Sequence, residues 1–447
     1  MSGSRPHRAF RHGVASGDPT PTSVVLWTRV DDAGDRPVPI TWSLWTERGG
    51  LVDRGRAWAA ADADHTCRVV VDRLVPGTDY HYIFEANGDR LAGRTRTLPS
   101  TAGSLRIAVA CCSRWGWPGF DDYAAILAEA PDLVLHLGDY IYEVGETPPD
   151  GPPTDPPYDC RTLDDYRRRY RQHRGHPALQ RLHAEVPFLS IWDDHEVMDN
   201  APDDPRGDRR AAGQRAWREW MPTRSTAAEP ELDRHLHIDG LLDLLLVDAR
   251  FGGRPPVDTS GPSTSRPDTA LLTEEQWGRI ESTIGTDSPW FVLANQVQVS
   301  PMTLGWMPAL RWPPGRRVVN PDQWDGFPAA RRRLVDLLDQ VPGTAVLLSG
   351  DLHAGWARAL LEGDRTIAHE FTSPSISGTT FAEAVRDTTW LPAWLVDRMI
   401  RRLNAGIDHL DLRRHGFLVV DVTVERFTAT FVHHDGTRVV QALDHPG

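Results

Sequence analysis

The sequence predicts an α/β protein in which a small all-β sandwich precedes a larger domain with a largely buried sheet. Three observations support this fold class. Residues 11–98 consist of short β-branched or aromatic segments separated by turn signals. From residue 104 onward, apolar segments alternate with segments of helical periodicity, which is typical of an α/β domain. Residues 416–434 have the pattern of two antiparallel strands.

The N-terminal strands are short, roughly alternating and bounded by Gly, Pro, Asp and Thr. The predicted strands are "SVVLWTRV" (23–30), "ITWSLWTE" (40–47), "CRVVVDRL" (67–74) and "DYHYIFEANG" (79–88). Turn signals such as "SGDPTPTS" and "VPGTD" lie beside them. We therefore expect a fibronectin-III-like β-sandwich domain over residues 7–98. The small polar segment "LPSTAGS" (98–104) is expected to be a linker.

The second domain is expected to span residues 104–447 and to begin with a βαβ unit. In "LRIAVACCS" (105–113) and "DLVLHLGD" (132–139) the residues are almost continuously apolar, and "FDDYAAILAEA" (120–130) between them has helical periodicity. Continuous apolar strands are typical of a sheet covered on both faces. Further buried strands are predicted in "VPFLSIWDD", "LLDLLLVDAR", "PWFVLANQ" and "TAVLLSGDLH", and helices in "TLDDYRRRYRQH", "RRAAGQRAWREWM", "TEEQWGRIESTI" and "AARRRLVDLLDQ".

Composition and charge exclude some classes of function. The chain has 447 residues, 40% of them hydrophobic, and a formal charge of −13, so extended nucleic-acid binding is not expected. No apolar run reaches the length of a transmembrane helix. The start, "MSGSRPHRAF", lacks the apolar region of a signal peptide. We therefore expect either a cytoplasmic protein or an exported one whose leader is missing from this sequence.

Several predicted strands end at side chains that bind metals. In α/β folds the ligand site lies beyond the carboxyl ends of the strands. A single Gly-Asp after a strand is usually only a turn with a helix cap, but a set of such ends indicates a metal site. The strand ends in question are Cys111-Cys112-Ser113, Gly138-Asp139, Asp193-Asp194-His195-Glu196 and Gly350-Asp351-Leu352-His353.

The residue types indicate which metals would bind. Thiolate, phenolate and imidazole suit a transition metal such as Fe3+, whereas carboxylates and carbonyls suit Ca2+, Mg2+ or Mn2+. A mixed set suggests two or more metal ions bridged by a carboxylate. Paired metal ions about 3.5–4 Å apart are a recurring solution for the hydrolysis of phosphate esters.

A series of motifs in this order resembles the alkaline phosphatase D family, also described as phospholipase D-like phosphodiesterases, within the calcineurin-like metallophosphoesterase superfamily. The motifs are "GVASGDPTPTSVVLWTR", "HLGDYIYE", "WDDHEVMDN", "DQWDGFPAARRRL", "SGDLH" and "EFTSPSISG". The resemblance extends over nearly the whole chain. It implies a catalytic domain of two packed sheets flanked by helices, that is, a two-sheet metallophosphoesterase sandwich.

The resemblance also implies a ligand set of one Fe3+ with Ca2+ beside it; the alternative is Zn2+ or Mn2+. By position, the ligands of the iron are Cys112, Asp139, Tyr142 and His353, with Asp139 bridging the metals. Asp351 is expected to bind calcium, and Asp194 or a near neighbour to bind the second metal. His195 and Asp194 are the expected catalytic residues.

Some of these assignments have close competitors. Strand alternation points Cys111 and Cys112 in opposite directions, and only the family pattern favours Tyr142 over Tyr140. Asp193 is either a ligand or a partner of Asp194. Further possible site residues are Asn200, which follows Asp199 where the family usually has a second asparagine, and Asn295 at the end of a buried strand.

The function expected from this set is metal-dependent hydrolysis of small phosphate mono- or diesters by a metal-activated hydroxide. His195 would contact the phosphate or protonate the leaving group; its simpler role is to orient Asp194. A protein of the same fold that binds phosphate or a partner without catalysis is the alternative from another class. The intact ligand set favours the enzyme. The sequence does not decide between monoesters and diesters, and it does not determine the oligomeric state.

Overall fold

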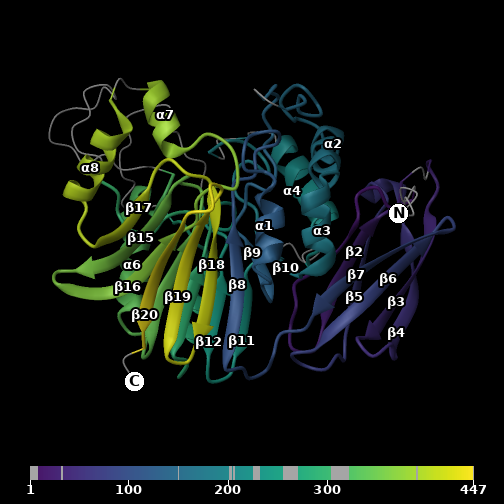
Figure 1. The fold of residues 1–447 in the computed structure, drawn as a ribbon, viewed down its shortest axis with the longest axis horizontal. Coiled ribbons are helices and arrows are strands. Elements are labelled where there is room, and N and C mark those ends of the chain that lie inside the picture. The colour runs from purple at the N-terminus through teal and green to yellow at the C-terminus, as the bar shows by residue number, and fades with distance from the viewer. Residues whose placement is uncertain are drawn as a thin grey trace.

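The structure is a computed structural model that describes residues 9–31, 34–148, 151–200, 204, 207–224, 232–254, 270–303, 322–388 and 391–445. Three sheets, of nine, seven and four strands, organise these residues. The N-terminal strands lie at the right of Figure 1 and the C-terminal strands at the left, with helices gathered above and between them.

The N-terminal sandwich packs a four-stranded sheet against three further strands. The sheet has the order β4-β3-β6-β7, and the strands facing it are β1, β2 and β5. Their bounds are β1 Val14–Gly17, β2 Val24–Arg29, β3 Val38–Thr46, β4 Leu51–Ala59, β5 Thr66–Val71, β6 Asp79–Ala86 and β7 Asp89–Arg96. One apolar core, including Leu26, Ile40 and Phe84, fills the space between them.

Strand β1 connects this sandwich to the rest of the chain. It pairs in parallel with β10, where Gly17 lies opposite Phe188, so β1, β2 and β5 belong to the nine-stranded sheet. The order of that sheet is β20-β19-β18-β8-β9-β10-β1-β2-β5. The other bounds are β8 Ser104–Ala110, β9 Leu133–His136, β10 Phe188–Ser190, β18 Gly416–Thr423, β19 Arg426–His433 and β20 Arg438–Asp444.

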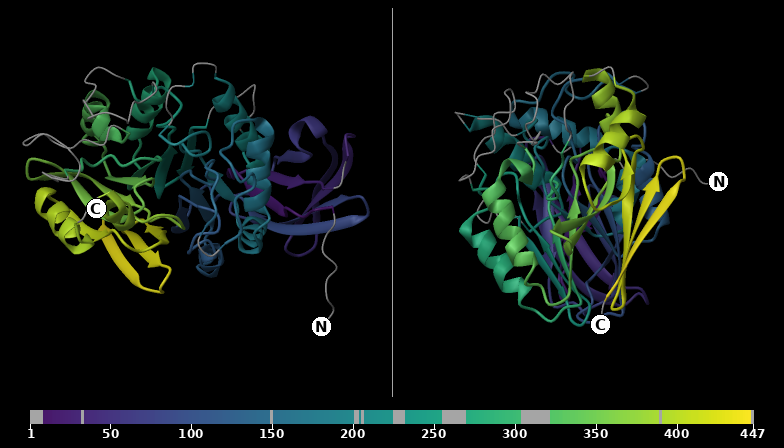
Figure 2. Two further views of the ribbon diagram at one scale, coloured as in Figure 1. Left: turned by 90° about the horizontal axis from the view of Figure 1, so that it is seen from above. Right: turned by 90° about the vertical axis from the view of Figure 1, so that its left-hand side faces the viewer.

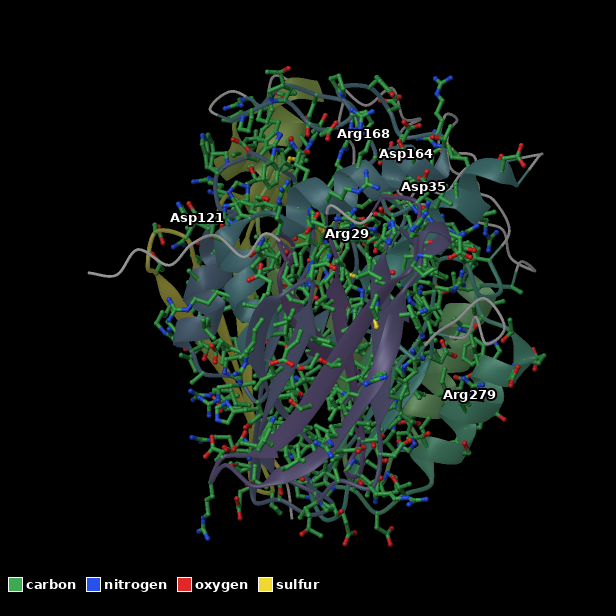
Figure 3. The ribbon with its side chains drawn as sticks, turned by 90° about the vertical axis from the view of Figure 1, so that its right-hand side faces the viewer. Arg29, Asp35, Asp121, Asp164, Arg168 and Arg279 are labelled. Atoms are coloured by element: carbon green, nitrogen blue, oxygen red, sulfur yellow. The ribbon has the colours of Figure 1, made fainter. Side chains whose placement is uncertain are left out.

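A charged contact also fastens the sandwich to a helix of the second domain. Arg29, labelled in Figure 3, donates to the Asp64 carboxylate from Nη2 at 3.1 Å. Arg171 of α2 (Leu163–Arg174) donates to the same buried carboxylate from Nε at 3.1 Å. Asp64 therefore links β2 to α2. Ion pairs as well as strand pairing hold the N-terminal sandwich against the second domain.

The seven-stranded sheet has the order β11-β12-β13-β14-β16-β15-β17. Strands β12, β13, β14 and β16 run in parallel, and the outer strands are antiparallel to their neighbours. The bounds are β11 Arg234–Ile238, β12 Leu242–Leu246, β13 Trp290–Ala294, β14 Thr344–Ser349, β15 Gly355–Glu362, β16 Arg365–Thr372 and β17 Ile407–Asp411.

The two large sheets pack face to face, and helices cover their outer faces. Side chains of alternate residues, such as Leu244 and Leu246 of β12 and Ile107 and Val109 of β8, share the main core between the sheets. The intervening Leu245 packs on the other face, in the core that α5 (Glu274–Ile284) and α6 (Pro328–Leu338) complete. The right-hand view of Figure 2 shows these green helices outside the sheet.

Five other helices complete the described fold. Helix α1 (Asp122–Ala128) crosses between the parallel strands β8 and β9, as the sequence predicts. Helices α3 (Pro177–Glu185) and α4 (Asp208–Trp220) lie with α2 beside the sandwich. Helices α7 (Phe381–Thr388) and α8 (Ala393–Leu403) enclose a separate core with β15 and β17. The predicted fold class, two sheets flanked by helices and preceded by an all-β unit, is confirmed.

In the described part of the chain, no helix is both long and apolar enough to cross a bilayer.

Burial of His173 leads to a prediction about stability. His173 is fully buried on α2, where burial, reinforced by Arg169, lowers its pKa to about 3. In the unfolded chain the histidine takes up a proton near pH 6.5, whereas in the folded protein it stays neutral down to about pH 3. Protonation therefore favours the unfolded chain between these values, so the folded protein is most stable above pH 6.5 and loses stability as the pH falls towards 3. We expect the free energy of unfolding to fall by about 2 kcal/mol more between pH 6.5 and pH 5 in the wild type than in His173→Gln.

Urea unfolding at both pH values measures this difference. The control is His434→Gln, because the His434 side chain is 53% exposed. Equal pH dependence in the wild type and His173→Gln would show that His173 is not held neutral in the folded protein.

Candidate metal centre

The turns that follow β8, β9, β10 and β14 meet at one end of the two packed sheets. The turn after β8 bonds to the turn after β9, because Cys112 N donates to Gly138 O at 3.2 Å and Ser113 N to Asp139 O at 2.8 Å. Several donor residues in these turns have left-handed backbone conformations, which are uncommon outside glycine and cluster at functional sites. They are Cys112 (φ 57°), Asp139 (φ 52°), Asn200 (φ 58°), Asp351 (φ 62°) and His353 (φ 53°).

One group of donors at this end contains sulfur and nitrogen. Ligand atoms of Cys112, Asp139 and His353 all lie within 4.8 Å of one another. The Tyr142 hydroxyl donates to Asp139 Oδ2 at 3.1 Å and lies 3.0 Å from His353 Nε2. His353 Nδ1 is 2.5 Å from the carbonyl oxygen of Thr379, which leaves Nε2 facing the cluster. Thiol, carboxylate, phenol and imidazole therefore converge on one point.

A second group of donors beside it is dominated by oxygen. The same 4.8 Å limit brings together Asp139, Asp194 and His195, and also Asp193, Asp194 and Asp351. Asp139 thus belongs to both the sulfur-containing group and the oxygen-rich group. Such a shared carboxylate is the arrangement that a bridging ligand requires.

Arg250, which the sequence analysis missed, lies among the carboxylates. Its guanidinium is fully buried, and it donates to Asp351 Oδ1 at 2.6 Å and also to Asp193 and Asp322. Asp194 Oδ1 lies 3.6 Å from Arg250 Nη2. Burial would raise the pKa of Asp194, but Arg250, His195 and the backbone N–H of Asn200 hold that pKa at about 2. Arg250 follows a buried strand as the last residue of "LLDLLLVDAR", which was the available signal.

The charge on His195 depends on Glu143. His195 Nδ1 lies 2.7 Å from Glu143 Oε2, and the imidazole rests against the Tyr142 ring at a centroid distance of 4.2 Å. Burial lowers the pKa of His195, but the carboxylates of Glu143, Asp139 and Asp194 outweigh it and raise that pKa well above its usual value. His195 Nε2 is 3.7 Å from Asp199 Oδ1. These carboxylates therefore favour the protonated imidazole at the edge of the cluster.

Glu196 fixes the turn after β9 against the turn after β10. Its carboxylate accepts the backbone N–H groups of Asp139 at 3.0 Å, Tyr140 at 2.7 Å and Asp193 at 2.7 Å. Burial raises its pKa to about 7 despite these bonds. Glu143 and Glu196 both occur in the quoted motifs, but their roles depend on contacts that the motifs do not reveal.

The competing candidates occupy different positions. The Tyr140 hydroxyl lies 2.9 Å from His183 Nε2, away from the donors, and the Cys111 thiol faces the carbonyls of Ser373 and Pro374. Asn200 touches Asp194 through its backbone N–H. Asn295 Oδ1 accepts from Trp324 Nε1 at 3.0 Å and from Val297 N at 3.2 Å, so its bonds within the described chain go to the core behind β13.

The residues present fit metal ions. Burial is the main cause that raises the pKa of Asp139 and of Asp193, and neighbouring carboxylates reinforce it. A cation among these groups would relieve that repulsion. Asp194 Oδ1 is buried and has no hydrogen-bond partner among the described residues, as expected of an atom left for a ligand.

Comparisons with known proteins identify the family of the chain. The family model "PhoD-like phosphatase" matches residues 107–431, and "PhoD-like phosphatase, N-terminal domain" matches residues 2–99. Alkaline phosphatase D of Bacillus subtilis (strain 168) is 32% identical over 414 residues, covering 83% of this chain and 68% of that protein. A solved structure of PhoD matches with a TM-score of 0.85 at 26% identity, covering 99% of this chain and 92% of the other.

The fold, the donor-rich site and these matches define a phosphoric ester hydrolase. The chain belongs to the PhoD-like phosphatase family. The family resemblance found in the sequence motifs is confirmed, and so is the assignment to the class of phosphoric ester hydrolases.

Arg250 leads to a prediction about metal-free protein. Replacing it in Arg250→Met leaves buried carboxylates without their counter-charge, which typically costs about 3–5 kcal/mol of folding free energy. We expect this loss in chemical unfolding with a chelator present, and a partial recovery when Ca2+ is added. The matched control is Arg332→Met, whose ion pair with Glu362 is exposed and is worth at most about 1 kcal/mol. Equal losses in the two variants would contradict the role of Arg250.

Proposed function

We propose that this chain hydrolyses small phosphate monoesters or diesters at the turns that follow β8, β9, β10 and β14, with metal ions bound there. One observation carries the proposal. A sulfur- and nitrogen-containing donor group and an oxygen-rich donor group lie side by side and share Asp139. Two metal ions bridged by a carboxylate are suited to clamp the attacking and leaving oxygens of a phosphate ester.

The donor chemistry supports Fe3+ in the first group and Ca2+ in the second. Cys112, Tyr142, His353 and Asp139 would hold the iron, because thiolate, phenolate and imidazole favour a transition metal. Asp194 and Asp351, with Asp139 shared, would hold calcium through carboxylate oxygens. Asp193 accepts hydrogen bonds from Arg250 at both carboxylate oxygens and would not bind the metal directly. It would instead hold Arg250 beside the calcium ligands. Zn2+ or Mn2+ is the alternative, and the pair Cys112 and Tyr142 fits manganese poorly.

When bound, these ions would neutralise phosphate charge and lower the pKa of a water molecule so that it attacks phosphorus. The side chains of the chain supply the remaining functions. Glu143 orients His195 through Nδ1 and favours its protonated form, so that Nε2 would donate to a phosphate oxygen or to the leaving oxygen. Glu196 keeps Asp139 and Asp193 at a fixed separation by holding their backbone N–H groups.

Arg114 supports the assignment to anionic substrates. Its guanidinium lies over the Tyr142 ring at 5.6 Å and forms a bidentate pair with Glu146, with both N–O distances at 2.7 Å. The side chain is 21% exposed and lies at the rim of the site. We propose that Nη1, which takes no part in the pair with Glu146 and lies 3.5 Å from Thr379 Oγ1, contacts the non-reacting part of the phosphate.

Metal content tests the assignment of the thiolate. In protein purified without chelators, elemental mass spectrometry is expected to find about one iron per chain together with calcium. Cys112→Ser should lose most of the iron and retain calcium, because a hydroxyl is a poor substitute for a thiolate. The matched control is the neighbouring Cys111→Ser, which should retain both metals. Zinc or manganese without iron would overturn the ligand assignment, and equal iron in both variants would remove Cys112 from it.

The role of His195 is tested by changing the leaving group. For an alkyl phosphate, whose leaving oxygen needs a proton, His195→Gln should lower kcat by about 10²–10⁴-fold. For p-nitrophenyl phosphate, whose leaving group needs no proton, the loss should be much smaller. His176→Gln is the control, because its ring contacts Trp115 and Phe120 and not the donor cluster. An equal loss on both substrates would instead assign His195 to positioning Asp194.

A further inference from the structure

A second cluster of metal-binding side chains lies on the edge strand of the seven-stranded sheet. His235 and His237 are two residues apart on β11, so both point to the same face of the sheet. Asp243 of β12 is the direct cross-strand partner of His237. Leu236 and Ile238, between and beside the histidines, face the core between the large sheets. The three polar side chains therefore project together from the outer face.

The ligand atoms of this trio converge on one carboxylate oxygen. His235 Nε2 lies 2.6 Å and His237 Nδ1 2.9 Å from Asp243 Oδ1. All three ligand atoms lie within 4.8 Å of one another. The Asp243 side chain is fully buried, whereas those of His235 and His237 are 41% and 49% exposed. A rigid carboxylate is thus flanked by two imidazoles that are free to adjust by small rotations.

The other oxygen of Asp243 is fixed by two hydroxyl groups. Thr286 Oγ1 donates to Oδ2 at 2.7 Å and Ser288 Oγ at 2.5 Å. Such outer contacts orient a ligating carboxylate and leave its second oxygen free for a metal ion. Both hydroxyls belong to the segment after α5, whose C-terminal end carries a partial negative charge that also favours a cation.

We propose that His235, His237 and Asp243 form a second metal site, separate from the hydrolytic centre, which binds a divalent late transition metal such as Zn2+. Two imidazoles and one carboxylate suit these ions and not calcium. Three protein ligands leave one position of a tetrahedral ion open to water. Because Asp243 lies near the start of β12 and the hydrolytic cluster lies beyond the ends of parallel strands, the two sites are at opposite ends of the sheet.

The simpler alternative is an ion pair in which both imidazoles only donate hydrogen bonds to Asp243. That arrangement predicts no binding of metal at these residues. A bound ion would instead cross-link β11 to β12, so that the edge strand is held by metal as well as by its backbone hydrogen bonds. The two interpretations differ in a quantity that does not depend on hydrolase activity, namely the number of Zn2+ ions bound per chain.

The proposal is tested by titrating the whole protein with Zn2+ and measuring the heat of binding by isothermal titration calorimetry. We expect the double variant His235→Ala, His237→Ala to bind one equivalent fewer than the wild type and to hydrolyse phosphate esters at the same rate. The matched control is His434→Ala, which removes another surface histidine that contacts a carboxylate, that of Asp122, at 2.7 Å. It should retain the full stoichiometry. The same number of ions in the wild type and the double variant would overturn the proposal.

Two further measurements do not require the double variant to fold normally. In the wild type, Zn2+ should protect His235 and His237 from diethyl pyrocarbonate, as read by peptide mass spectrometry, and leave His434 reactive. In Ser288→Ala and Thr286→Val, Zn2+ affinity at this site should fall about 10–100-fold, because the carboxylate loses its orientation. Modification of His235 and His237 at the same rate with and without Zn2+ would contradict a metal site.

Discussion

The concentration of buried negative charge at the ends of the strands is the constraint on which the rest of the structure depends. Ionised carboxylates in a protein interior are costly unless cations or hydrogen-bond donors compensate them. The chain provides Arg250 for Asp193, Asp322 and Asp351, and backbone N–H groups for Glu196. Asp139 lies close to further carboxylates, and Asp194 Oδ1 has no hydrogen-bond partner among the described residues; this is where the donor geometry suits metal ions. The donor set of the candidate metal centre and the electrostatic cost therefore have the same origin.

The scaffold keeps these charges at fixed positions. Strand ends from both large sheets meet over one shared core, which places the donor-bearing turns beside one another. The left-handed residues Cys112, Asp139, Asp351 and His353 turn the chain sharply after each strand and aim the side chains inward. On the other side, the pairing of β1 with β10 supports the strand that precedes Asp193 and Asp194, and the contacts of Asp64 with Arg29 and Arg171 link the sandwich to α2. The N-terminal sandwich thus contributes to the site indirectly.

Sequence patterns predicted continuously buried strands better than strands with exposed residues. The apolar segments that become β8, β9, β12, β13 and β14 are buried on both faces, so their signal is continuous. The elements that were not predicted are the helices α3, α7 and α8 and the strands β1, β4, β7, β11, β15, β16, β17 and β20. Strand β11 has the same length as β12, but exposed residues lie between its apolar ones, so it lacks the continuous apolar signal. Tertiary packing fixes such segments.

By itself the sequence determined the fold class, the family and the set of strand ends at which donors occur, because those properties depend on local periodicity and on motif order. Only the tertiary structure decided which of two adjacent candidates lies at the cluster. Tyr142 contacts Asp139 and His353, whereas Tyr140 contacts His183. It also revealed Arg250, which is 57 residues from Asp193 in the chain and in contact with it in space. Charge compensation acts through space between segments distant in sequence, and no local pattern encodes such contacts.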